Sequence, residues 1–231
     1  MRKPGVLLLG MIAAAMVILI AASVSASTIS YQGAIAPTET DWVSQLQFSK
    51  FDPALGTLTG VTFDLTGTVQ GSMGFEHTST SKSANITMAL SALLTVTKGA
   101  STLVTAWPSY SVLTPNVPVF DGTIDYNGAS GKTFTGISKS ASNSAVLHSG
   151  DAGFSDFIGL AGNPGLIALD ASAVGTSTHA GSGNMYAFFV TNAGVDYKVT
   201  YEFDPVPEPG SILALATGLI GLTGLAVRRR R

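Results

Sequence analysis

Between residues 27 and 206 the sequence alternates apolar and polar side chains, and this period of two limits the possible folds more than any other feature. The run VTFDLTGTVQGSMGF puts its apolar residues on one face: Val61, Phe63, Leu65, Val69, Met73 and Phe75. Residues 85–99 and 195–203 repeat the pattern with Ile86, Met88, Leu90, Ala92, Leu94 and Val96, and with Val195, Tyr197, Val199, Tyr201 and Phe203. Because successive side chains of a strand point to opposite faces, each run predicts a strand with one buried and one wet face.

Shorter apolar runs predict further strands at 42–51, 102–106, 167–173 and 185–190, separated by Gly, Ser, Asn and Pro. No segment of this region keeps a helical period over three turns. We therefore predict an all-β fold: a single antiparallel β-sandwich over residues 27–204, with a jelly roll as one possible arrangement. An N-terminal signal peptide and a C-terminal transmembrane helix are expected to flank it.

The N-terminal segment has the layout of a secretory signal peptide. Arg2 and Lys3 precede a long apolar run, and small residues stand two apart at Val24 and Ala26. This predicts a signal peptide over residues 1–26, exported through the Sec machinery and cleaved between Ala26 and Ser27. An uncleaved membrane anchor is the alternative, because the apolar run is longer than a usual signal core.

The C-terminal segment combines an uncharged stretch with a basic end. Residues 212–227 carry no charge, and as an α-helix they span about 24 Å, slightly less than the roughly 30 Å hydrocarbon core of a bilayer. The terminal cluster Arg228, Arg229, Arg230 and Arg231 is expected to stay in the cytoplasm by the positive-inside rule. The body between the two ends is then outside the inner membrane.

The order Pro207, Glu208, Pro209, apolar helix and arginine cluster resembles the PEP-CTERM sorting signal of Gram-negative bacteria. The resemblance covers residues 205–231. It implies that an exosortase, a membrane-embedded processing enzyme, recognises Pro207 to Pro209 while the helix holds the chain in the inner membrane. A plain tail anchor is the alternative.

Two segments, FDPALGTLTGVTFDLTGTVQG at 51–71 and residues 157–203, are similar to the choice-of-anchor E family of bacterial surface proteins. That resemblance implies an extracellular β-rich body and carries no catalytic residues. Together the two resemblances imply a place at the cell surface or in a biofilm matrix that contains exopolysaccharide.

Composition argues against several functions. Residues 27–206 hold six basic residues, all lysine, and 13 acidic ones, a net charge of −7, which is unsuited to binding nucleic acid. The chain has no cysteine, so it has neither disulfides nor thiolate metal sites. We predict no cofactor.

The sequence gives little support for catalytic or metal-binding residues. His77, His148 and His179 are isolated from one another, and a metal site built from them is disfavoured. Residues 148–156 bring His148, Ser149, Asp151 and Asp156 together in sequence, but catalytic triads are assembled from separate segments, and no GxSxG motif is present. We predict no catalytic and no metal residues.

Other side chains keep alternatives open. The turn aspartates Asp121 and Asp125, with Asp151 and Asp156, lack the spacing of a calcium loop. Trp42, Trp107, Tyr110 and Tyr126 are candidates for an aromatic sugar platform, with Trp107 and Pro108 the most suggestive pair.

Three functions follow, in order of preference. The first is a non-enzymatic, exported surface or matrix protein. The second is a carbohydrate-binding module acting on exopolysaccharide or envelope glycan. The third is an enzyme acting on an envelope polymer, which would need paired carboxylates or a metal in one cleft.

Overall fold

The computed structural model describes residues 26–181 and 183–206. The predicted signal peptide up to residue 25, the sorting motif from Pro207 to Pro209, the predicted helix 212–227 and the arginines 228–231 lie outside the described residues. Within the described residues, no helix has the length and apolar sequence that crossing a bilayer requires.

The regular elements of the described residues are strands, apart from one short 3-10 helix, so the prediction of an all-β fold is confirmed. In chain order they are β1 (Ser27–Glu39), β2 (Trp42–Ser49), β3 (Gly56–His77), β4 (Ala84–Lys98), β5 (Ser101–Ala106), β6 (Ser109–Val117), β7 (Gly131–His148), η1 (Phe154–Phe157), β8 (Leu166–Gly175), β9 (Thr178–Ala180) and β10 (Met185–Pro205). Residues Thr28–Phe203 form one compact unit.

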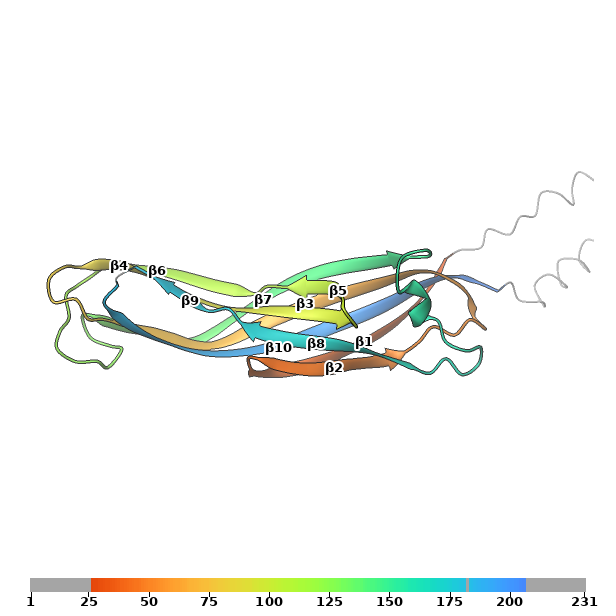
Figure 1. Cartoon of the computed structure of the whole chain (residues 1–231), viewed down its shortest axis with the longest axis horizontal. Helices are drawn as coiled ribbons and strands as arrows, with labels where there is room; N and C mark the ends of the chain where they lie inside the picture. The colour runs from red at the N-terminus through yellow and green to blue at the C-terminus, as the bar shows by residue number, and fades with distance from the viewer. Residues whose placement is uncertain (1–25, 182, 207–231) are drawn as a thin grey trace, which may run out of the picture. The chain divides into compact units, whose positions relative to one another are not determined.

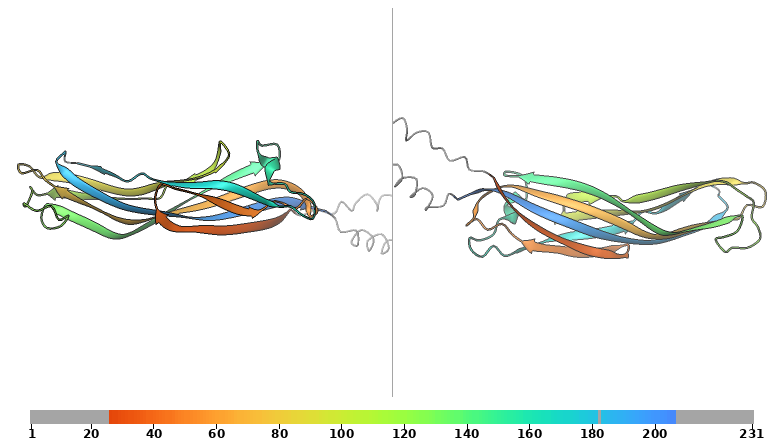
Figure 2. Two further views of the ribbon diagram at one scale, coloured as in Figure 1. Left: turned by 60° about the horizontal axis from the view of Figure 1, so that its bottom comes forward. Right: turned by 180° about the vertical axis from the view of Figure 1, so that it is seen from behind.

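The strands form two sheets that run along the length of this unit (Figures 1 and 2). Sheet A has the order β1-β10-β3-β7. Sheet B has the order β2-β8-β4-β5, and β6 and β9 also pair with β4. The pairs β2–β8, β3–β7, β4–β5 and β4–β8 are antiparallel, as predicted.

Each edge of β4 in sheet B pairs with two successive strands instead of one. Leu94 pairs with Ala106 of β5 and Ser91 with Ser109 of β6, so β5 and β6 continue one path along the same edge of β4. On its other edge β4 pairs first with β8 and then with β9. With these pieces joined, β1 to β4 alternate between the two sheets and β10 lies between β1 and β3, which is the strand order of a jelly roll.

One hydrophobic core fills the space between the sheets. The predicted inward faces of β3 and β4 are buried throughout, from Val61 to Phe75 and from Ile86 to Val96. On β10, Val195, Val199, Tyr201 and Phe203 are buried as well. Tyr197 differs from the prediction and is only partly buried, because it packs at the margin of the core, where its hydroxyl oxygen lies 3.5 Å from the Gln47 carbonyl oxygen.

Some strand boundaries differ from the prediction. The strand predicted at 42–51 ends at Ser49, and Phe51 makes an isolated parallel bridge with Ile158 instead. The segments predicted separately at 185–190 and 195–203 belong to the single strand β10.

Strands β1, β6, β7 and β9 were not predicted. Strand β7 is the plainest case: Ile137 is its only buried residue, because it is an edge strand of sheet A. Its outward side chains include Ser138, Ser140, Ser142 and Ser144. An edge strand needs few apolar residues, so its sequence carries little signal.

Strands β1 and β10 are neighbours in sheet A. The start of β1 and the end of β10 lie at the same end of the body (Figure 1). The loops 78–83 and 118–130 lie at the opposite end (Figure 1). The segments before β1 and after β10 therefore join the body at one end.

Candidate functional site

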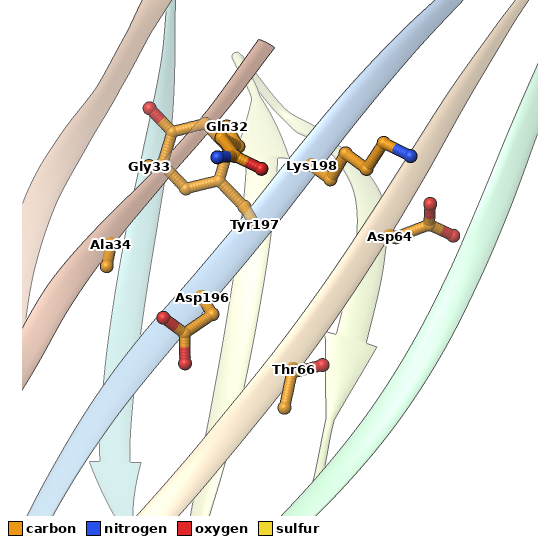
Figure 3. Close-up of a pocket in the computed structure, with 8 residues that line it drawn as sticks. All are labelled: Gln32, Gly33, Ala34, Asp64, Thr66, Asp196, Tyr197 and Lys198. Carbon is orange, nitrogen blue, oxygen red and sulfur yellow. The ribbon is translucent and has the colours of Figure 1, made fainter. Parts of the chain in front are cut away.

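A shallow depression of about 550 Å³ lies on the outer face of sheet A (Figure 3). Strands β1, β10 and β3 supply its lining. The lining residues are Gln32, Gly33, Ala34, Asp64, Thr66, Asp196, Tyr197 and Lys198. Asp64 and Asp196 face outward because their neighbours Leu65 and Val195 face the core.

The position of Tyr197 depends on Gly33. A Cβ atom at Gly33 would lie 2.5 Å from the Tyr197 hydroxyl oxygen, so any larger residue would displace the ring. Burial raises the pKa of the Tyr197 phenol above its ordinary value. The phenol lies on the core side of sheet A, with its hydroxyl oxygen 3.5 Å from the Gln47 carbonyl oxygen, so it is not offered to a ligand on the outer face.

The polar groups of this depression suit hydrogen bonding better than catalysis. Asp64 accepts a hydrogen bond from the Ser144 hydroxyl at 2.8 Å. Asp64 and Asp196 are the paired carboxylates that an envelope hydrolase would need, but both are exposed. A carboxyl group that acts as a general acid near neutral pH has to be desolvated. The depression can hold a polar ligand, but it is open to water and does not desolvate either carboxyl group as a general acid requires.

The three histidines lie in different parts of the body. His77 is buried near the far end of β3, and its Nδ1–H donates to the Pro118 carbonyl oxygen at 2.7 Å. His148 ends β7, and His179 on β9 stacks on Phe189 with 6.4 Å between the ring centroids. Among residues 26–181 and 183–206, no three His, Asp or Glu side chains are grouped so that they could hold a metal ion.

The segment 148–156 has a structural explanation. The Asp151 carboxylate accepts a hydrogen bond from the His148 backbone N–H at 2.8 Å and so closes the turn. Asp156 forms an ion pair with Lys98, whose hydrogen bond holds the pKa of that carboxyl below its ordinary value. Phe154 and Phe157 of η1 are buried in the core. These acids therefore fasten the loop, and neither is held against a histidine ring.

Asp121 and Asp125 also bond to nearby backbone. Asp121 accepts hydrogen bonds from the N–H groups of Thr123 at 3.1 Å and Ala129 at 3.3 Å. The Thr123 bond is the main reason that the pKa of Asp121 is lowered. Asp125 accepts the Asn127 N–H at 2.9 Å. Both are turn aspartates of the loop 118–130.

Sequence reasoning missed Glu76, which anchors the same loop. This carboxylate is fully buried and accepts hydrogen bonds from the Ser130 hydroxyl at 2.6 Å and the Tyr126 backbone N–H at 2.8 Å. In the sequence, Glu76 looks like a polar residue at a strand end. Its burial depends on the loop folding back over it, which no local pattern predicts.

The four candidate aromatic residues do not form one platform. Trp42 is partly buried, and its Nε1–H donates to the Ala193 carbonyl oxygen at 3.1 Å. Tyr126 packs edge-on against Phe188, and the Lys139 ammonium lies over the Tyr110 ring. Trp107 is 64% exposed on the outer side of sheet B. Only Trp107 is available to a large flat ligand.

The predicted cleavage site lies at the start of the fold. Ala26 is exposed, and Ser27 is the first residue of β1. Cleavage between these residues would leave β1 complete.

Comparison with known proteins identifies the C-terminal segment. The PEP-CTERM protein-sorting motif is found at residues 205–231. The motif implies an exported protein that is held in the membrane and then processed by an exosortase. No curated protein matches the chain, and the resemblance of residues 51–71 and 157–203 to the choice-of-anchor E family finds no support.

Solved structures give only distant likenesses. The structure of the Gt strain of infectious bursal disease virus is 14% identical over 87% of this chain and 48% of that chain, with a TM-score of 0.11. The Gx strain gives 11% identity, 87% and 50% coverage, and a TM-score of 0.13. The VP2 subviral particle of the same virus gives 14% identity, 88% and 50% coverage, and 0.12. The chain thus spans about half the length of these proteins, and such scores carry no functional argument.

Proposed function

We propose that this chain is a non-enzymatic, exported surface or matrix protein of a Gram-negative bacterium. Its β body is the functional part, and the two ends are export and sorting devices. An exosortase processes the C-terminal end after the helix has held the chain in the inner membrane.

The observation that carries this proposal is the position of the sorting motif relative to the fold. Pro205 is the last residue of β10, and only Val206 separates it from Pro207. At the other end the predicted cleavage falls directly before Ser27. Both ends can therefore be removed without taking a strand from the body.

The acidic, hydroxyl-rich body supports a role outside the cell. Residues 27–206 have a net charge of −7. Ser and Thr side chains on the outer face of sheet A hydrogen bond across strands, as between Thr66 and Ser142 at 2.8 Å. Such a surface stays hydrated and repels other copies, which favours a soluble or loosely bound extracellular protein.

Cell fractionation of a motif variant tests the proposal. Glu208→Ala is expected to keep the full-length chain in the inner membrane, whereas the unmodified chain is processed and reaches the surface or the medium. Asp204→Ala is the matched control, because it removes a nearby exposed acid of β10 that lies outside the motif. Equal processing of both variants would refute recognition through the motif.

A carbohydrate-binding module is the second candidate function. The observation in its favour is the exposure of Trp107, a large aromatic side chain that this fold does not bury. The test is binding of the full-length chain to an array of exopolysaccharides and envelope glycans. Failure to bind any of them would remove this candidate and leave the first one standing.

A further inference from the structure

Three exposed apolar side chains form a row across the outer face of sheet B. They are Val174 of β8, Leu93 of β4 and Trp107, exposed by 48%, 38% and 64%. Leu93 pairs with Val174 in the β4–β8 register. On the other edge of β4, Leu94 pairs with Ala106, so the next residue, Trp107, stands opposite Leu93. We call these three residues the Trp107 row.

The Trp107 side chain is fixed in place rather than free in solvent. Its Nε1–H donates to the Thr176 hydroxyl at 3.1 Å, and Thr176 follows β8 on the far side of β4. The indole therefore reaches across β4. The Thr176 carbonyl oxygen accepts the buried Ser91 hydroxyl at 2.8 Å, which holds Thr176 itself.

The backbone at Trp107 is constrained as well. Trp107 and Pro108 form the break between β5 and β6, and the Pro108 ring restricts the chain at this point. The Pro108 carbonyl oxygen accepts the Ala92 N–H at 3.3 Å. Binding a ligand over this indole would cost little conformational entropy, because the Trp107 side chain is already ordered.

The Trp107 row lies next to hydroxyl side chains, and few charged residues share its face. Thr95, Ser172 and Thr105 form the adjacent row on the same face, and Val43 of β2 extends that row beyond Ser172. Among the Asp, Glu, Lys and Arg residues in the described part of sheet B, only Asp170 points to this face. Its carboxylate accepts a hydrogen bond from the Gln45 amide at 3.3 Å.

We propose that this face binds a neutral polysaccharide, with one sugar ring stacked on Trp107. A pyranose ring has an apolar face of C–H groups that matches a flat indole, and a rim of hydroxyls that matches the neighbouring Ser and Thr side chains. The weakly charged face gives no attraction for an acidic polymer. This proposal names the ligand of the second candidate function and rests on it.

A second copy of the chain is the competing occupant. Stable protein complexes bury roughly 1,200 Å² or more in total. A row of three partly exposed side chains beside a row made mostly of hydroxyls is small for that purpose, whereas it matches one or two sugar rings. We therefore favour the saccharide.

Tryptophan fluorescence tests this proposal directly. The chain has two tryptophans, so Trp42→Phe leaves Trp107 as the only one. The full-length variant in detergent micelles is titrated with cellohexaose, mannohexaose and dextran as neutral probes and alginate as an acidic one. We expect a saturable blue shift of the Trp107 emission with at least one neutral probe.

Calorimetry on further variants locates the binding. Trp107→Ala should weaken binding by about tenfold or more, the effect of losing roughly 1.4 kcal/mol, while Trp107→Phe should retain part of the affinity. Gln70→Ala is the control on the outer face of sheet A, outside the depression of Figure 3, and should leave the affinity unchanged. The thermal unfolding midpoint of each variant checks that it is folded.

Three results would overturn the proposal: no binding of any neutral probe, binding that Trp107→Ala leaves unchanged, or binding of alginate alone. A blue shift that grows with protein concentration in the absence of sugar would assign the face to a second copy and would also overturn it. Since these measurements use purified protein, their failure would leave the proposed sorting untouched.

Discussion

The outer faces of the two sheets differ in how their side chains find partners. On sheet A the outward groups bond to each other across strands: Thr66 with Ser142 and Thr68 with Ser140, each at 2.8 Å. On sheet B the Trp107 row exposes apolar surface to water. Polar groups that already have partners gain little from a ligand, whereas exposed apolar surface gains free energy when it is covered. Sheet A exposes apolar side chains as well, such as Val146 of β7 at 48%, but the Trp107 indole is a larger flat surface and is 64% exposed, which makes sheet B the better candidate for a binding face.

The outer faces of both sheets rest on one shared core, and Phe63→Ala tests this point. Phe63 is 2% exposed and contacts the rings of Phe48 and Phe157. Its truncation should lower the free energy of unfolding by about 3–5 kcal/mol, measured by chemical denaturation. Thr62→Ala, on the outer side of the same strand, should change it by about 0.5 kcal/mol or less. Equal effects would contradict the shared core.

A second prediction concerns Tyr201, which faces the core from β10. Its hydroxyl donates to the Ser49 carbonyl oxygen at 2.9 Å, and burial raises the pKa of this phenol well above its ordinary value. The unfolded chain then releases this proton at lower pH than the folded chain. The stability that depends on this proton is therefore complete below pH 10 and is lost as the pH rises further.

Denaturation midpoints between pH 7 and 11 check this prediction. Tyr201→Phe should lower the free energy of unfolding by about 1 kcal/mol at pH 7, because a hydrogen bond is lost. It should also reduce the loss of stability above pH 10. Tyr186→Phe, at a residue that is 55% exposed, is the control and should show the same loss of stability above pH 10 as the unmodified chain. If Tyr201→Phe kept the full decline, the explanation would fail.

The polar bonding on sheet A predicts coupling between Thr66 and Ser142. A double-mutant cycle with alanine at both positions should give an interaction free energy of about 0.5–1 kcal/mol. The pair Thr62 and Ser142 lies in different rows of the same face and should be additive. A coupling near zero for Thr66 and Ser142 would mean that their bond does not distinguish this face.

A small effect on stability is expected at Trp107, although its side chain is large. Trp107→Ala should lower the free energy of unfolding by no more than about 1 kcal/mol, because the indole covers little of the core and makes one hydrogen bond. Thermal and chemical unfolding of the full chain measure it. A loss as large as that of Phe63→Ala would show that Trp107 is a structural residue and not a binding one.

Sequence predicted the strands that bury a full face. Phe63 on β3 and Leu90 on β4 sit in unbroken alternation, and both are buried as expected. The strands β1 and β7 were missed because edge strands need few apolar residues, and most of β7 is exposed. The order of the strands depends on pairings between distant segments, which local alternation does not encode.

The candidate sites were predictable to different degrees. Trp107 could be singled out because it precedes Pro108 at a strand end. The depression of Figure 3 could not be predicted, because it forms where three strands distant in sequence, β1, β3 and β10, lie side by side. Glu76 was missed for the same reason, since a loop closes over it only in the folded chain.

Mass spectrometry of the protein recovered from the cell surface or the medium gives the sharpest test of export and sorting, because it reads both ends of the mature chain. We expect an N-terminus at Ser27 and a C-terminus that lacks residues 212–231. A folded chain that runs intact from Met1 to Arg231 and is found in the cytosol would contradict it.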